Sequence, residues 1–204
     1  MVQMTPERER VRSYLVSQAE KKTFAELTGV VEEARSAFLA EIEGVSEAQA
    51  RFKPRRQALR EPQGGPQDAA LRQAQDAAPA GDEEDWSIAE VLRHVIQSEE
   101  GLAARVRALA LGESGRGPVA GRLAGHEGDA LPELVAALRT SRGSLSDAVS
   151  AVAGRERLDT TAPHPFFGEL NCRAWFLFQR VHDNDHTGQV KKIKADPAYP
   201  KPSA

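Results

Sequence analysis

The chain has 204 residues, of which 40% are hydrophobic and 28% charged, a composition typical of a globular protein that can bury a core. Its 27 basic and 30 acidic side chains give a net charge of −3, so no broad positive field exists for a phosphate backbone and we expect no nucleic-acid binding. No apolar run approaches the roughly 20 residues of a membrane-spanning helix and no signal peptide is recognisable, so we expect a cytoplasmic protein that does not enter a membrane.

The first part of the chain predicts two helical segments and then an insertion. Thr5 can cap the free amides of a helix whose first turn tolerates Pro6, which predicts a helical extension over residues 1–23. A second helix ends near Gly44, because apolar side chains before it recur every three or four positions, at Leu27, Val30, Val31, Ala34, Phe38 and Ile42. Residues 57–84 are rich in Gln, Ala, Pro and Gly and can bury little, so they are predicted to be a mobile insertion.

The next helix begins after Ser87, since Glu90 stands three residues further on at the spacing of a capping box. It runs to about Leu111 with one apolar stripe, formed by Ile88, Val91, Leu92, Val95, Ile96, Leu102, Val106 and Leu109. A Gly-rich loop over residues 112–128 follows.

A further helix begins near Asp129 and Pro132 and ends at Gly154. The prolines of the stretch TAPHPFFGEL argue against helix, so this stretch is predicted to be a turn-rich connection. The last helix then extends from about Glu169 to about Ala195. Because no segment alternates with the period of a strand, we predict an all-α four-helix bundle, a fold that can build a metal site from facing helices.

Three histidines are the candidate metal ligands. His182 and His186 lie four residues apart on one face of the last helix, where two imidazoles can chelate one cation. His94, at the edge of the apolar stripe of the 88–111 helix, can supply a third ligand if the bundle brings the two helices together. Three imidazoles leave coordination positions open, as in catalytic sites, and suit zinc, nickel or iron. The alternative is that they are hydrogen-bonded core residues, and Asp183 after the first histidine excludes the metalloprotease pattern HExxH.

Other polar residues near these histidines have two possible roles each. Gln189 can hydrogen-bond a metal-bound water or hold a neighbouring helix, and Glu90 and Asp185 can orient an imidazole or serve only as capping or solvent-exposed groups. Cys172 is interpreted as a small buried side chain and not as a nucleophile or ligand. No ligand role is assigned to the two remaining histidines, His126 and His164, the second of which can cap local backbone or approach the mouth of the site.

Three stretches in chain order resemble motifs of DinB-like proteins: DWSIAEVLRH over residues 85–94, HPFFGEL over residues 164–170 and HDNDHTGQ over residues 182–189. The resemblance covers residues 24–195, leaving the extension 1–23, the insertion 57–84 and a tail 196–204 outside it. It implies a four-helix bundle, often a homodimer, in which His94, His182 and His186 bind a divalent metal.

The family's known activities set the functional hypotheses. They include bacillithiol and mycothiol transferases and a thiol-dependent isomerase, in which the metal is thought to bind the cofactor thiol as a thiolate. We therefore expect a metal-dependent enzyme that activates a low-molecular-weight thiol such as bacillithiol or mycothiol for S-transfer to a small-molecule substrate, with activation of water as the hydrolytic variant. The rival hypothesis is a non-enzymatic metal-binding protein of stress response or interaction.

Overall fold

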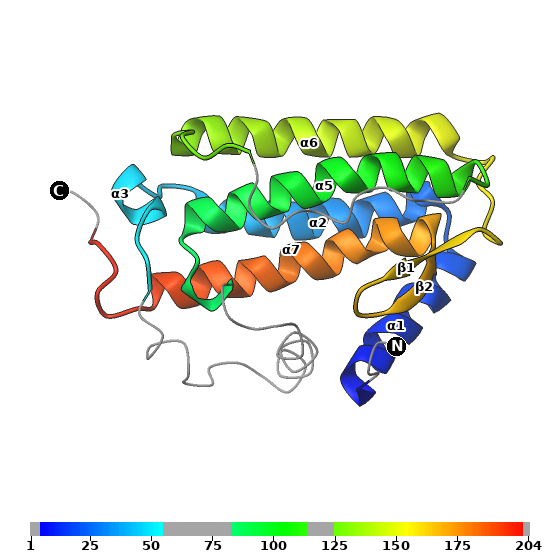
Figure 1. The fold of residues 1–204 in the computed structure, drawn as a ribbon, viewed down its shortest axis with the longest axis horizontal. Helices are drawn as coiled ribbons and strands as arrows, with labels where there is room; N and C mark the ends of the chain where they lie inside the picture. Colours follow the sequence, from blue (N-terminus) through cyan, green and yellow to red (C-terminus); the bar gives the residue numbers. More distant parts are fainter. Residues whose placement is uncertain (1–4, 55–82, 114–124, 202–204) are drawn as a thin grey trace.

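Four long helices form a bundle in the computed structural model, which describes residues 5–54, 83–113 and 125–201 (Figure 1). Helix α5 packs against both α6 and α7, and α7 also packs against α2. The all-α bundle predicted from the sequence is confirmed. The bounds of these helices are Phe24–Ile42 for α2, Ile88–Ala110 for α5, Leu131–Val152 for α6 and Cys172–Lys194 for α7.

Local capping signals set most helix ends where the sequence predicts them. The Thr5 hydroxyl accepts a hydrogen bond from the Arg8 amide at the start of α1 (Pro6–Lys21). Ser87 and Glu90 form the predicted reciprocal capping box of α5. Gly44 and Gly154 follow α2 and α6 with φ of 74° and 76°, the left-handed conformation that glycine adopts at low cost after a helix.

The connection before α7 differs from the prediction because it contains a β-hairpin. Strand β1 (Thr161–His164) pairs antiparallel with β2 (Gly168–Asn171), with His164 opposite Gly168. Glu169 therefore belongs to a strand, and α7 begins three residues later than predicted, at Cys172 with Asn171 as its cap. Each strand has only 4 residues, too few for an alternating pattern to stand out in the sequence.

Two short helical elements also escaped the sequence analysis. Helix α3 (Glu47–Ala50) is capped by Ser46, and the 3₁₀ helix η2 (Glu83–Asp85) precedes α5. Residues 57–82 of the predicted insertion, and residues 114–124 of the predicted Gly-rich loop, lie outside the described residues.

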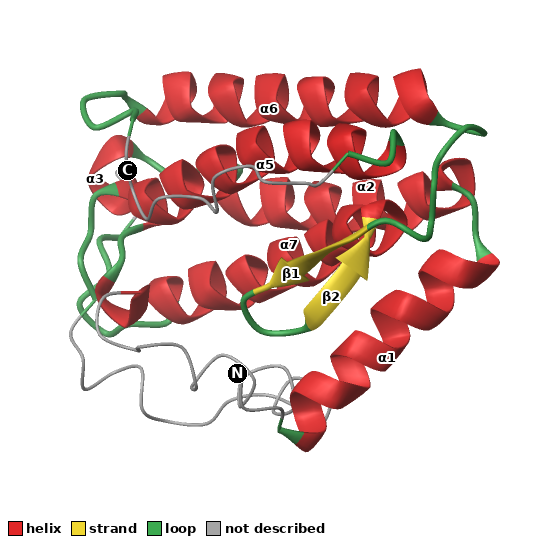
Figure 2. Cartoon of the chain, turned by 45° about the vertical axis from the view of Figure 1, so that its right-hand side comes forward, coloured by secondary structure: helices red, strands yellow, loops and turns green. Residues whose placement is uncertain are grey.

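Helix α1 lies beside the hairpin and against α7 (Figure 2). Its Leu15 and Ala19 are fully buried in the same apolar cluster as residues of α2, α5, α6 and α7. Helix α1, which lies within the extension predicted from the sequence, is thus packed into the core of the bundle.

A layer of charged side chains divides the apolar core in two. We call the set Arg35, Glu99, Arg142 and Asp183 the charged layer; each of the four bundle helices contributes one member, and none is more than 8% exposed. Val31 and Phe38 flank Arg35 on α2 and belong to different apolar clusters. The same change of cluster occurs on the other three helices, between Ile96 and Leu102, between Leu138 and Leu145, and between Leu177 and Val190.

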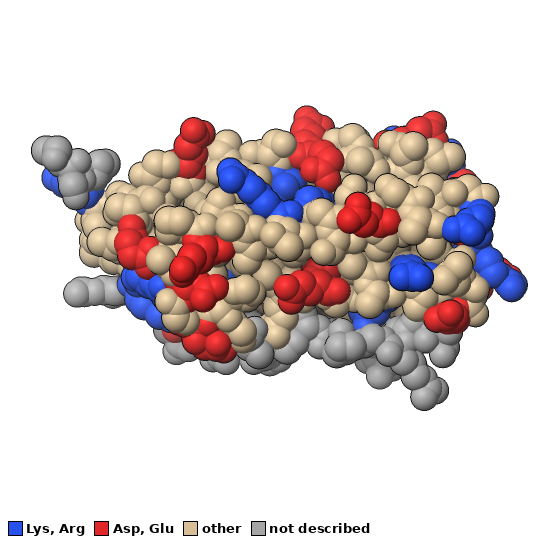
Figure 3. Space-filling view, turned by 90° about the horizontal axis from the view of Figure 1, so that it is seen from above, with Lys and Arg blue, Asp and Glu red and all other residues tan. Residues whose placement is uncertain are grey.

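On the outer face drawn in Figure 3, acidic and basic side chains are interspersed over α6, and neither sign forms a continuous patch. Among the described helices, none combines the length and the apolar character needed to cross a lipid bilayer.

If α1 is part of the cooperative core, Leu15→Ala should lower the free energy of unfolding of the whole bundle by about 2–5 kcal/mol, the cost of a cavity at a fully buried leucine. Denaturant unfolding monitored by circular dichroism measures this. The exposed neighbour Ser13→Ala is the control and should stay within about 0.5 kcal/mol of the native chain. An unchanged main transition in Leu15→Ala would show that α1 unfolds separately.

Candidate metal centre

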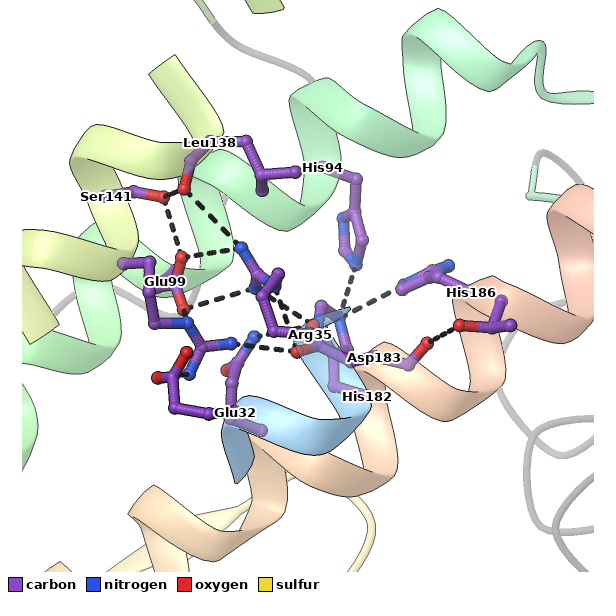
Figure 4. A network of polar contacts seen from close by, with 12 residues as sticks. Glu32, Arg35, His94, Glu99, Leu138, Ser141, His182, Asp183 and His186 are labelled. Carbon is purple, nitrogen blue, oxygen red and sulfur yellow. Dashed lines mark hydrogen bonds and ion pairs between the residues drawn. The ribbon is translucent and has the colours of Figure 1, made fainter. Parts of the chain in front are cut away.

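The three predicted ligands meet between α5 and α7. His94 Nε2 lies 3.1 Å from His182 Nε2, which in turn lies 3.2 Å from His186 Nε2 (Figure 4). Among the described residues, these are the three side chains whose potential ligand atoms gather within 4.8 Å of one another as a possible cation site. The packing of α5 on α7 therefore brings together residues that are 88 positions apart.

The spacing of these nitrogens fits a divalent cation. Metal–nitrogen bonds of about 2.0–2.1 Å at angles of 90–109° would separate the ligand atoms by roughly 2.9–3.4 Å. Both close pairs share His182 Nε2, and a proton on this nitrogen can point to only one of the other two imidazoles. One cation, in contrast, accepts a lone pair from all three nitrogens. The donor set, three imidazoles, suits zinc, nickel and iron.

Hydrogen bonds to Gln189 define the tautomer of His186. The Gln189 Nε2 group donates to the backbone carbonyl of Glu83 at 2.6 Å. Because a carbonyl can only accept, the NH₂ group of Gln189 must face Glu83. The Oε1 atom of Gln189 therefore faces His186 Nδ1, at 2.8 Å, and accepts a hydrogen bond from the Nδ1–H group. The His186 Nε2 atom is then unprotonated and turns its lone pair toward the other two imidazoles, so Gln189 orients a candidate ligand.

The environment keeps His182 neutral. Burial, followed by the proximity of His186 and His94, lowers the pKa of His182 well below its ordinary value of 6.5. Aromatic rings flank the site: Phe178 lies 5.6 Å from His182 and Trp86 5.0 Å from His94, centroid to centroid. The central imidazole of the cluster is therefore neutral and lies in partly apolar surroundings, as metal ligation requires.

His164 lies in an aromatic wall that connects the hairpin to the site. Its ring stacks on Phe167 at 4.8 Å and contacts Phe178 at 4.4 Å, and Phe178 in turn contacts His182. Burial, followed by the charge of Arg105, lowers the pKa of His164 to about 3. The neutral Nδ1 accepts a hydrogen bond from the Phe166 amide at 3.1 Å, so the local capping role considered for His164 is present.

The other candidates lie outside the cluster of imidazoles. Cys172 is fully buried, as predicted; its Sγ lies 3.7 Å from the Arg157 carbonyl, and burial raises its pKa to about 11, which disfavours the thiolate. Glu90 caps α5 and pairs with Lys53, so its capping role is the observed one. His126 lies in a surface loop, 2.6 Å from Asp129.

The charged layer is the part of this region that sequence reasoning missed. Asp183, considered in the sequence only because it excludes the metalloprotease pattern, is fully buried between Arg35 and Arg142. The signal was present, because Arg35 follows Val31 by four residues and precedes Phe38 by three, the spacing of the buried stripe. A charged residue at a stripe position in each of four helices indicates buried ion pairs.

Removing the acceptor for His186 should change its tautomer. In Gln189→Leu, His186 should lose its preference for the Nδ1–H form, detectable in the ¹H–¹⁵N NMR spectrum of the imidazoles of the metal-free protein, and zinc affinity should fall by about 10–100-fold. Gln189→Glu retains an acceptor and should keep the Nδ1–H form. An unchanged imidazole spectrum in the leucine variant would contradict the assignment.

His164 should make stability depend on pH in the acid range. Its pKa is about 3 in the folded protein against 6.5 for an unperturbed histidine, so between these values only the unfolded chain takes up the proton, and stability falls as the pH is lowered. His164→Asn should remove a slope of up to about 1.4 kcal/mol per pH unit between pH 6 and pH 4. Denaturant unfolding of metal-free protein at several pH values measures it.

Phe52→Leu is the matched control, because its ring packs on Tyr199 against the apolar cluster that does not contain Phe167, and the substitution removes no titratable group. Its stability should differ from the native chain by the same amount at each pH. Parallel pH profiles of the native chain and His164→Asn would exclude the buried neutral histidine.

Comparison with known protein families gave a match that covers most of the chain. The sequence model described as the DinB superfamily matches residues 31–190, a range that contains His94, His182, His186 and Gln189. No match was found among curated proteins or among solved structures.

Proposed function

The chain belongs to the DinB superfamily, and on that premise we propose that it is a metal-dependent enzyme whose cation activates a low-molecular-weight thiol or a water molecule. The observation that carries the proposal is the convergence of three Nε2 atoms, those of His94, His182 and His186, at 3.1 and 3.2 Å.

Incomplete coordination by the protein supports catalysis over a purely structural metal. Among the described residues, no fourth His, Cys, Asp or Glu joins the three imidazoles. Structural zinc sites usually have four protein ligands, whereas catalytic sites keep a position for water or substrate. When bound, a divalent cation supplies Lewis acidity that lowers the pKa of a thiol or water and so favours a nucleophile at neutral pH.

The surrounding residues have separate tasks in this proposal. Gln189 holds the His186 ring with its lone pair toward the cation site. Phe178 and Trp86 flank His182 and His94 with apolar surface that limits water around the reacting group. The Nε2–H group of neutral His164 is a donor in the adjoining aromatic wall.

A small thiol from solution is the preferred nucleophile. The one cysteine of the chain, Cys172, is buried and has a raised pKa, so it is not available to supply the thiol. We propose S-transfer from a thiol such as bacillithiol or mycothiol to a small electrophile, with zinc, nickel or iron as the metal. Water is the nucleophile in the hydrolytic version.

The domain division belongs to the same proposal. We propose residues 24–195, with the insertion 57–84, as the metal-binding bundle, residues 1–23 as an N-terminal extension and residues 196–204 as a tail. Burial of Leu15 in the core of the bundle supports a structural task for the extension. A homodimer and a cytoplasmic location stay predictions.

Metal analysis tests the proposal first. Protein purified without a histidine tag should contain about one equivalent of zinc, nickel or iron per chain by mass spectrometry, before or after reconstitution. The variant His182→Ala/His186→Ala should contain none, because two of three ligands are gone. No metal in the native chain after reconstitution would refute the proposed site.

A single substitution then separates catalysis from a structural metal. His186→Ala should abolish turnover in assays with bacillithiol, mycothiol or glutathione while the melting temperature changes little. A large loss of melting temperature, with no turnover of any thiol by the native chain, would favour the non-enzymatic alternative. His126→Ala is the control, because this histidine lies in a surface loop and is not one of the three clustered imidazoles.

A further inference from the structure

The charged layer is built from alternating partners (Figure 4). Its two carboxylates, Glu99 and Asp183, belong to α5 and α7, the helices that carry the candidate ligands. Its two guanidinium groups, Arg35 and Arg142, belong to α2 and α6, which carry none of the three. Each arginine contacts both carboxylates, so the ligand-bearing helices are joined twice through side chains of the other two.

Arg35 makes the more complete of the two bridges. Its Nε and Nη2 donate to the two oxygens of Asp183 at 3.0 and 2.9 Å, and its Nη1 and Nη2 donate to the two oxygens of Glu99 at 3.2 Å each. Bidentate contacts of this kind are directional, because the planar guanidinium must lie in the plane of each carboxylate. Burial alone would lower the pKa of Arg35, but Asp183 and Glu99 more than offset it and raise that pKa.

Arg142 closes the layer from the other side. It lies 2.8 Å from Asp183 and 3.0 Å from Glu99, and Ser141 Oγ donates to Glu99 at 2.7 Å. Gln179 Nε2 donates to Asp183 at 3.4 Å. Every carboxylate oxygen of the layer therefore accepts at least one hydrogen bond, and both carboxylates are held in one orientation.

The layer lies next to the candidate ligands along both helices. Asp183 directly follows His182, and Glu99 follows His94 by five residues, about 7.5 Å along α5. A shift of one residue turns a helix by about 100°, which would take His182 away from His94. Apolar side chains of similar size can exchange places across a helix interface at low cost, whereas the bidentate contacts of Arg35 hold in one register only.

We propose that the charged layer is a positioning device for the metal site: it fixes the rotation and the register of α5 relative to α7, so that the three imidazoles converge before any metal binds. Buried ion networks add little net stability compared with apolar residues of equal size, but they can specify one arrangement of helices. The inference depends on the proposed metal site, since its effect is measured on metal binding.

The test replaces the layer by apolar residues of similar size, in the variant Arg35→Met/Glu99→Leu/Arg142→Met/Asp183→Leu. The matched control is Arg173→Met/Glu156→Leu, which removes another shielded ion pair, at the start of α7 and away from the imidazoles. Unfolding of the metal-free proteins measures stability, and Co²⁺ titration measures affinity together with the visible absorption spectrum, which reports coordination geometry. All titrations are made well below the melting temperatures.

The layer variant should stay folded but bind Co²⁺ at least about tenfold more weakly than the native chain, with a changed spectrum, while the control keeps native affinity and spectrum. If the layer served stability alone, its replacement would change the melting temperature but not the Co²⁺ affinity of the folded protein. Native Co²⁺ affinity and a native spectrum in the layer variant would therefore overturn the inference.

Two further outcomes are decisive. If the layer variant does not fold, Arg35→Lys replaces it, because lysine keeps the charge but cannot bridge two carboxylates bidentately. Weaker Co²⁺ binding by folded Arg35→Lys supports the inference, and native affinity overturns it. If the native chain itself binds no Co²⁺, the proposed metal site is wrong and the positioning role is refuted with it; native binding with an unaffected layer variant refutes the positioning role alone.

Discussion

Two buried arginines that share two buried carboxylates determine how the helices of this bundle meet. The charged layer contains one residue from each bundle helix and separates the core into two apolar clusters. Removing one member would leave a charge without its partner in a dry interior, which costs far more than the network contributes to net stability. The layer therefore acts as a constraint on arrangement, and the apolar clusters on either side supply most of the stabilising burial.

The candidate metal centre depends on this constraint and on a second, local one. Helix register brings His94 to His182 and His186, and a hydrogen bond to Gln189 then sets which nitrogen His186 offers. The Gln189 amide, fixed by the Glu83 carbonyl, gives His186 an unprotonated Nε2. A backbone carbonyl just before α5 thus influences a ligand on α7, and the site is prepared by polar contacts outside the cluster of imidazoles.

The charged layer and the cluster of three histidines both place polar side chains where a buried stripe is usually apolar, and the two lie side by side. Charged groups in a core reduce the energy gained by burial, and neutral histidines with lowered pKa values make the fold sensitive to acid. Such departures from local consistency are expected where a protein must hold a functional arrangement. Here the two buried carboxylates, Glu99 and Asp183, lie on the helices that carry the proposed ligands, and the two arginines join these helices from α2 and α6.

The sequence by itself determined the features that depend on neighbours along the chain. Capping at Thr5 and Ser87 and the four-residue spacing of His182 and His186 follow from helix geometry. The place of His94 beside an apolar stripe made it a candidate third ligand, and the family motifs strengthened that prediction. Only the tertiary structure decided which helix faces which, because periodicity identifies a buried face but not the partner it packs against. It thereby revealed the charged layer, the hydrogen bond of Gln189 to the Glu83 carbonyl and a hairpin whose strands pair through backbone hydrogen bonds that no side-chain pattern encodes.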